Sequence, residues 1–363
     1  MRDSTRPRQS EGTKAGTVKA VPDEPSRQIG RFRLEEEIGS GAMGVVYRAH
    51  DLDLGRTVAI KTIRADLLSQ EHLYQTYRSR FYNEASIFGS LSHPNIVTLY
   101  DVGEGDQGIP FLAMEYVSGA SLADHAESDR QFSFDEIMWL FAQLASGIDY
   151  AHEREVIHRD IKPSNVLVAD DSEVKIADFG VAKLLGTEFT RSQTQFGTPG
   201  YMSPEQVVGK ALTNRADIFS LGVVAFELLS GEMPFPGKHV HTVLHKLVHV
   251  DPVLPETLAE RGLDRGRWES LFGRALAKDP DARHTSASEL VAELVDLLPG
   301  SWLGHLSAAG SEPKLDFGPS PSEGDAPRET LTLWGSRDDS EVSEVELELI
   351  VDEDDLPADR TGT

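Results

Sequence analysis

Four short strings, spaced in a fixed order, constrain this sequence more than any other feature. A glycine-rich GSGAMGVV begins at Gly39, and VAIK ends at Lys61. Further along, HRDIKPSN contains Asp160, and DFG begins at Asp178, eighteen residues later. In this order the strings supply a glycine-rich loop that can cover phosphate groups, a cation that binds phosphate, a carboxylate that accepts a proton and a carboxylate that binds a metal ion. Together these are the parts that phosphoryl transfer requires.

The first string has two interpretations when it is taken alone. The spacing GxGxxG also marks dinucleotide-binding folds, where a helix opens directly after the glycines. Residues 45–47 are instead β-branched and aromatic, which is typical of a strand. We therefore predict a hairpin tip at which Gly39, Gly41 and Gly44 let backbone amides approach phosphate oxygens. For this string in isolation, an ordinary glycine hairpin stays the alternative.

Lys61 closes an apolar strand 22 residues after Gly39. An ammonium beneath the glycine hairpin needs an acidic partner to orient it when nucleotide is bound. We expect Glu84 to be that partner, because FYNEASIFGSLSHPNIV indicates a helix with Glu84 on its inward face. Glu36, in the acidic run before the glycines, is the poorer candidate.

Composition divides the chain into three segments. Residues 1–29 have almost no large apolar side chains, which predicts a disordered N-terminal arm. Residues 30–299 are predicted to form one domain, with strand-like runs in 30–118 and helical periods in 119–299. Residues 300–363 are predicted to be an acidic, mostly disordered tail. An α+β fold of two lobes follows, with a small strand-rich lobe preceding a larger helical one.

The charge is concentrated toward the end of the chain. The formal net charge is −25, and residues 301–363 hold four Lys or Arg against sixteen Asp or Glu. This balance argues against general nucleic-acid binding, which needs clustered Lys and Arg. Within the tail, apolar and acidic residues alternate over 345–351, so a strand could form on a protein partner; a solvated acidic tail is the alternative.

Apolar runs are too short for a membrane helix, which needs roughly 20 apolar residues, and the start of the chain has no apolar core of a signal peptide. The chain has no cysteine, which suits a reducing compartment. We therefore expect a cytoplasmic protein.

The four ordered strings, together with GTPGYMSPEQ at residues 197–206, resemble the eukaryotic-type (Hanks-type) serine/threonine protein kinases of bacteria. The resemblance covers about residues 32–297. It implies a bilobal kinase fold that binds ATP between the lobes and transfers its γ-phosphate to Ser or Thr hydroxyls of protein substrates. The alternative is a catalytically weak kinase-fold scaffold that acts through its acidic tail.

The resemblance also implies roles for individual side chains. Asp160 would accept the proton of the substrate hydroxyl, while Lys162 and Lys61 neutralise phosphate charge. Asn165 and Asp178 would hold Mg²⁺ through hard oxygen ligands, and use of Mn²⁺ stays open.

The adenine base is expected against apolar side chains and the backbone between the lobes. The C=O of Glu115 and the N–H of Val117 would pair with its edge, and Met114 falls at the gatekeeper position. The whole expected nucleotide site consists of Ile38, Gly39, Ser40, Gly41, Ala42, Met43, Gly44, Val46, Ala59, Lys61, Met114, Glu115, Val117 and Leu167.

Regulation is expected in the segment after DFG. Arg159 precedes the catalytic carboxylate, and a phosphate of about −1.5 to −2 charge would neutralise it. The candidate sites of autophosphorylation are Thr187, Thr190, Ser192 and Thr194, with Thr198 expected to contact the catalytic loop. Dimerisation during activation is left open.

The resemblance implies structural roles for several other polar residues. Glu205 would pair with Arg283, and Asp217 would hold the catalytic-loop backbone. His158 would pack and hydrogen-bond in the core and would not act as a base.

Overall fold

The structure is a computed structural model, and it describes residues 28–40, 44–63, 78–79, 81–82, 85–86, 88–105, 108–127, 132–170, 172–179, 199–255 and 264–297. All of these residues belong to one unit of the chain, Met1–Ala326. The description below concerns these residues.

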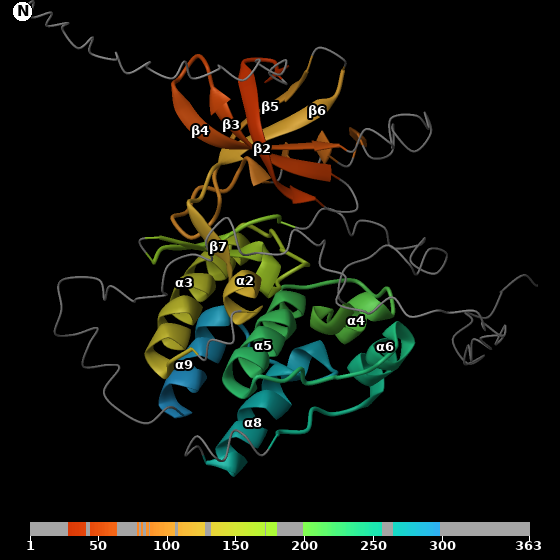
Figure 1. Cartoon of the computed structure of the whole chain (residues 1–363). Helices are drawn as coiled ribbons and strands as arrows, with labels where there is room; N and C mark the ends of the chain where they lie inside the picture. Colours follow the sequence, from red (N-terminus) through yellow and green to blue (C-terminus); the bar gives the residue numbers. More distant parts are fainter. Residues whose placement is uncertain are drawn as a thin grey trace, which may run out of the picture. The chain divides into compact units, whose positions relative to one another are not determined.

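Six antiparallel strands form the larger sheet, in the order β1-β2-β3-β4-β6-β5 (Figure 1). Their bounds are β1 Gln28–Ile29, β2 Phe32–Ser40, β3 Gly44–Asp51, β4 Arg56–Ile63, β5 Leu99–Glu104 and β6 Pro110–Glu115. The glycine-rich string spans the end of β2 and the start of β3, whose register pairs Gly39 with Val46. It therefore lies at a hairpin tip, as the strand-like residues after the glycines predict.

The alternation of side chains along β4 gives the sheet two different faces. Val58 and Ile60 are fully buried in a small cluster with Phe32 and Phe111. Because successive side chains of a strand point to opposite faces, Ala59 and Lys61 share the other face. Ala59 belongs to the larger core, which continues into the helical part of the protein. The strand period thus directs Lys61 toward the second lobe.

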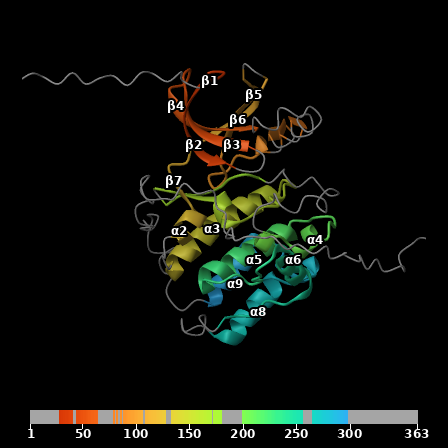
Figure 2. The same cartoon turned by 45° about the vertical axis from the view of Figure 1, so that its right-hand side comes forward.

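The second lobe combines a three-stranded sheet with helices. The sheet has the order β7-β8-β9, with bounds Gly119–Ser121, Val166–Ala169 and Val174–Ile176. The α-helices are α2 Leu122–Glu127, α3 Phe134–His152, α4 Pro204–Val207, α5 Arg215–Ser230, α6 Val240–His249, α8 Arg265–Ala275 and α9 Ala287–Leu297. Short 3-10 helices are η2 Pro163–Asn165, η4 Pro199–Tyr201 and η5 Pro280–Ala282. α4 and α6 lie side by side in both views (Figures 1 and 2).

A local signal in the sequence explains where α3 begins. α3 opens with a capping box, in which the Ser133 side chain accepts from the N–H of Glu136 and the Glu136 carboxylate accepts from the Ser133 N–H.

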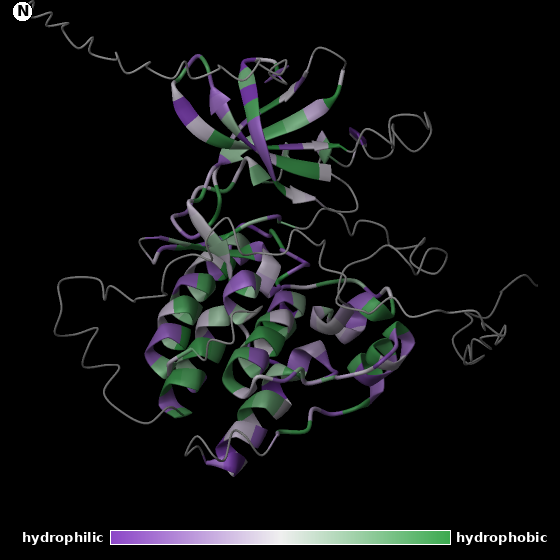
Figure 3. Cartoon of the chain, viewed as in Figure 1, coloured by the Kyte–Doolittle hydropathy of each residue, from purple (hydrophilic) through white to green (hydrophobic). Residues whose placement is uncertain are grey.

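Buried helices form the core of the second lobe. α5 is buried along most of its length, including Asp217 and Phe219. Hydrophobic stretches recur along α3 and α5 (Figure 3), and buried residues of α3, α5, α8 and α9 contribute to the core of this lobe.

Glycine is required where the chain passes from the larger sheet into the second lobe. Gly119 has φ +150°, and a Cβ there would lie 2.1 Å from the carbonyl oxygen of Val168. β6 ends at Glu115 and β7 begins at Gly119, so the connector consists of residues 116–118.

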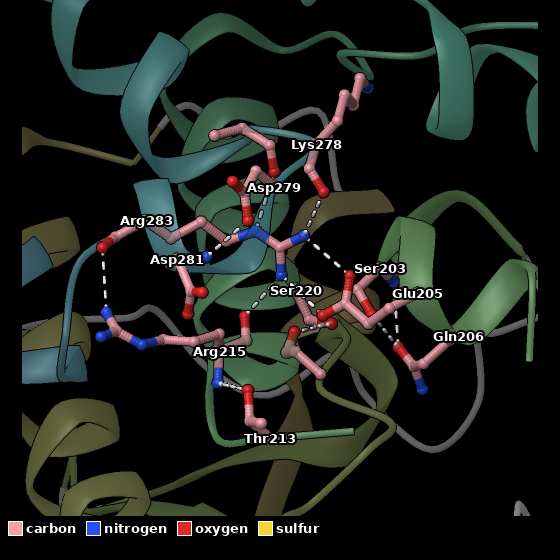
Figure 4. A network of polar contacts seen from close by, with 12 residues as sticks. Ser203, Glu205, Gln206, Thr213, Arg215, Ser220, Lys278, Asp279, Asp281 and Arg283 are labelled. Atoms are coloured by element: carbon pink, nitrogen blue, oxygen red, sulfur yellow. Dashed lines mark hydrogen bonds and ion pairs between the residues drawn. The ribbon is translucent and has the colours of Figure 1, made fainter. Parts of the chain in front are cut away.

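A buried ion pair ties α4 to the segment before α9 (Figure 4). The guanidinium of Arg283 donates to both carboxylate oxygens of Glu205, at 2.7 and 2.8 Å. Its remaining N–H groups donate to backbone carbonyls of Ala277, Arg215 and Lys278. All five guanidinium donors therefore have acceptors. The predicted pairing of Glu205 with Arg283 is confirmed.

The predicted α+β architecture of a strand-rich lobe and a helical lobe is confirmed. The described residues between 78 and 88 are helical, in agreement with the helix predicted there. The expected N-terminal arm, except for Gln28 and Ile29 in β1, and the acidic tail lie outside the described residues, so those segment boundaries stay predictions.

Candidate active site

Lys61 and Asp178 meet although 117 residues separate them. Nζ of Lys61 donates to Oδ1 of Asp178 over 2.8 Å. The Lys61 ammonium lowers the pKa of Asp178 below its ordinary value, and this attraction outweighs burial, which alone would raise it. Asp178 has φ +54°, an unusual conformation for a residue with a Cβ. The surrounding structure therefore holds the backbone of Asp178 in this conformation. Its carboxylate is ionised.

Asp160, Lys162 and Asn165 form a second cluster on the loop that leads into β8. Nζ of Lys162 lies 2.9 Å from Oδ2 of Asp160. The Asn165 amide donates through Nδ2 to the backbone oxygen of Asp160 at 2.8 Å and to Oδ2 at 3.0 Å. The backbone N–H of Ala177 donates to the Asn165 carbonyl at 2.9 Å, so this cluster lies beside the segment that carries Asp178.

Asp217, on buried α5, holds the backbone of the same loop. Its carboxylate accepts from the N–H of His158 and from the N–H of Arg159, each at 2.8 Å. Burial alone would raise the pKa of Asp217, but bonds from His152 and the loop lower it below the ordinary value. Arg159 has φ +69°, a strained conformation for a residue with a Cβ. The predicted anchoring role of Asp217 is confirmed.

His158 is 1% exposed, and both ring nitrogens are engaged. Nδ1 accepts from the N–H of Asp160, and Nε2 pairs with the carbonyl oxygen of Ala177. This pattern requires the neutral tautomer with hydrogen on Nε2, and burial lowers the pKa of His158 accordingly. The structural role predicted for His158 is confirmed.

Phe179 joins the two lobes through aromatic contacts. Its ring stacks on Phe88 at 5.8 Å between centroids and lies 4.6 Å from the His158 ring. Phe179 is buried, so its packing against Phe88 and His158 fixes the position of the neighbouring residue, Asp178. None of the patterns in the sequence predicts this contact.

The apolar residues expected around the adenine differ in how deeply their side chains are buried. Ala59 and Met114 are buried, and the register of β4 with β6 places them opposite each other. Val46 and Leu167 are partly buried against the same core. Ile38 is 44% exposed.

The two described glycines of the hairpin differ in what a side chain would meet. A Cβ on Gly44 would lie 2.3 Å from the carbonyl oxygen of Thr62, whereas one on Gly39 would meet only Val46, at 3.9 Å. The packing of β3 against β4 is therefore a sufficient reason for glycine at position 44, whether or not its amide binds phosphate. The expected approach of these amides to phosphate stays a prediction.

Comparison with known proteins gives the family. A model of the protein kinase domain matches residues 32–295. The chain belongs to the protein kinase family. It is 34% identical over 307 residues to a probable serine/threonine-protein kinase of Streptomyces coelicolor, covering 83% of this chain and 45% of that protein. It is 36% identical to the serine/threonine-protein kinase PknB of Mycolicibacterium smegmatis (76% and 44% covered) and 35% identical to a probable PknB of Bifidobacterium longum (84% and 44%). The chain thus spans less than half the length of these relatives.

Membership of the kinase family implies ATP and a divalent metal ion, and the side chains present fit both. Asp178 is ionised, and the Asn165 amide turns its N–H₂ toward Asp160, which leaves Oδ1 as an oxygen ligand. Within the described ranges no group of three or more His, Asp or Glu side chains could hold a metal by itself. An ion at this kinase site would therefore take further ligands from nucleotide or water oxygens.

Several expected site residues of this kinase domain lie outside the described residues. They are Gly41, Ala42, Met43 and Glu84, the candidate phosphorylation sites Thr187, Thr190, Ser192 and Thr194, and Thr198. Glu36, the poorer candidate partner of Lys61, lies 3.7 Å from Arg48 in an exposed ion pair. None of the described helices has the length and hydropathy to cross a membrane.

Proposed function

We propose that this chain is an ATP-dependent serine/threonine protein kinase, which transfers the γ-phosphate of ATP to Ser and Thr hydroxyls of proteins. One observation carries the proposal: Lys61 contacts Asp178, while Asp160, Lys162 and Asn165 form a cluster one backbone hydrogen bond away. The names of the bacterial relatives support the serine/threonine class.

In this proposal, bound ATP supplies the phosphoryl group, and Mg²⁺ neutralises its charge. Asn165 and Asp178 would hold the ion, and Lys61 would hold phosphate oxygens. The Asp160 carboxylate orients the acceptor hydroxyl and accepts its proton. Lys162, 2.9 Å from that carboxylate, offers positive charge where negative charge builds up on the transferred group. Little covalent chemistry falls to the protein, so positioning and charge dominate.

The finer parts of the proposal concern the surroundings of the site. We propose that Glu84 orients Lys61, that the expected apolar residues and the backbone of Glu115 and Val117 hold adenine, and that one or more of the candidate Thr and Ser residues is autophosphorylated. Protein substrates, a protein partner for the acidic tail, a dimer in activation and a cytoplasmic location belong to the same proposal.

Transfer of labelled γ-phosphate from ATP to a generic basic protein tests this function. We compare the wild-type chain with Asp160→Asn and with Asp53→Asn, an exposed Asp in the turn after β3, as a matched control. Loss of a general base should reduce transfer by about 10²–10⁴-fold, and Asp53→Asn should leave it unchanged. Phosphoamino-acid analysis should find label on Ser and Thr. Equal incorporation with wild-type and Asp160→Asn protein would contradict the proposal and favour a scaffold role.

A further inference from the structure

A buried lysine lies between the two ends of the proposed nucleotide site. Lys175, the middle residue of β9, has a side chain that is only 9% exposed. Its ammonium donates to the carbonyl oxygen of Pro94 at 2.8 Å and lies 3.1 Å from Oε1 of Glu115 and 3.4 Å from Oε2 of Glu173. Three acceptors match the three N–H groups of an ammonium. A charge this deeply buried is found only where its partners are fixed.

Glu115 connects this ammonium to the last residue of β6. Oε2 of Glu115 accepts from the backbone N–H of Thr98 at 3.1 Å, while the Glu115 N–H donates to the Thr98 carbonyl at 2.8 Å. Both carboxylate oxygens are therefore engaged, one by Lys175 and one by the backbone of Thr98. The side chain of Glu115 thus determines how the chain leaves β6 and enters the connector at residues 116–118.

The segment before Thr98 is attached to the same strand β9. The amide of Asn95 donates to the carbonyl of Val174 and to Oε1 of Gln143, both at 2.9 Å. The N–H of Ile176 donates to the Asn95 carbonyl at 2.9 Å, and the N–H of Val97 donates to the Ile176 carbonyl at 3.0 Å. Hydrogen bonds and the Lys175–Glu115 ion pair thus connect residues 94–98, β6 and β9 in one network, and the Lys175 ammonium contacts both residue 94 and β6.

We propose that Lys175 is a positioning residue for nucleotide binding. Through Glu115 it holds the backbone that would face adenine, and it lies in β9, the strand that ends two residues before Asp178. The ion pair therefore sets the spacing between the adenine end and the metal end of the site. This inference rests on the proposed kinase function, because that function assigns the two ends.

The proposal predicts a change in nucleotide affinity that exceeds any change in turnover. Lys175→Met keeps the apolar stem of the side chain but leaves the Glu115 carboxylate without its cation. The connector is then free to shift, so we expect the KM for ATP to rise about tenfold, which corresponds to about 1.4 kcal/mol. The kcat at saturating ATP should fall less than about threefold, because Lys175 touches none of the reacting groups.

A purely structural role gives a different pattern. A variant that only lowers the folded fraction loses kcat and Tm but keeps the KM of the molecules that remain folded. Lys175→Arg retains the positive charge and should keep the KM within about threefold of wild type. Lys238→Met, at an exposed lysine before α6, is the matched control and should change neither constant.

The experiment is steady-state phosphoryl transfer with varied ATP, using the full chain, together with Tm measurements. Glu115→Gln should raise the KM in the same direction, and the double variant should be no worse than Lys175→Met, because both remove one interaction. A KM for Lys175→Met within twofold of wild type, whatever its Tm, would overturn the proposal. If Lys175→Met does not fold, Glu115→Gln decides by the same criterion.

Failure of the proposed function would look different. It would show as a wild-type chain without Asp160-dependent transfer. In that case, calorimetric titration of the same variants with ATP and Mg²⁺ decides on Lys175 by the same tenfold and twofold limits.

Discussion

Arg283→Met should destabilise the protein much more than loss of an exposed arginine. All five donors of this guanidinium have acceptors, and the side chains of Arg283 and Glu205 are 0% and 5% exposed. Methionine fills much of the space but leaves the Glu205 carboxylate buried without its cation. Removing one partner of such a pair costs about 3–5 kcal/mol. This is a large fraction of the roughly 5–15 kcal/mol by which a folded domain is stable.

The assay is urea unfolding followed by tryptophan fluorescence, since Trp268 is 1% exposed and reports on the helical lobe. Arg265→Met is the control, because Arg265 and Glu269 form an i,i+4 pair that is 52% and 56% exposed. It should cost no more than about 0.5 kcal/mol. Adding Glu205→Leu to Arg283→Met should recover part of the loss, because the unpaired charge is then gone. Equal losses in the two single variants would refute the reasoning.

Three further predictions each concern a single residue. Gly44→Ala should destabilise the protein by about 1–3 kcal/mol, because its Cβ would lie 2.3 Å from the Thr62 carbonyl oxygen; Gly39→Ala should leave Tm unchanged but raise the KM for ATP if its amide approaches phosphate, and an unchanged KM would remove that role. Bonds from Thr285 and the ion pair with Arg274 lower the pKa of Glu289 to about 2, against an ordinary value of 4.5. A lowered carboxylate pKa stabilises the fold above the ordinary value and ceases to do so as the pH falls through the folded one. The difference in unfolding free energy between wild type and Glu289→Gln should therefore be full at pH 6 and shrink between pH 4.5 and 2; a difference that is constant with pH would contradict this.

Local patterns in the sequence predict much of the fold. The helical period in FDEIMWLFAQLASGIDYAHE corresponds to α3, Phe134–His152, and the run GVVYRAHD is β3. α3 buries one face, so the spacing of its apolar residues indicates a helix, whereas the β-branched and aromatic residues at 45–47 indicate the strand β3. The resemblance also assigns Lys61 and Asp178 to one nucleotide site, but it does not predict their direct ion pair, because the acidic partner expected for Lys61 is Glu84.

The contacts around Lys175 could not be predicted in this way. Its partners Pro94 and Glu115 are 81 and 60 residues away in the sequence, and no pattern in the sequence connects either of them with Lys175. A lysine between two strand residues is ordinarily solvated, and only the packing of three separate segments reveals that this one is buried. The clash that requires glycine at position 44 is likewise invisible in the sequence, because it involves the backbone of a neighbouring strand.

The central claim is that Lys61, Asp160, Asn165 and Asp178 act together as one site of phosphoryl transfer. The most direct test is mass spectrometry of the dephosphorylated wild-type and Asp160→Asn chains after incubation with ATP and Mg²⁺. The account predicts phosphate on Ser or Thr residues of the wild-type chain and none on the variant. An unmodified wild-type chain, or equal phosphorylation of both proteins, would contradict it.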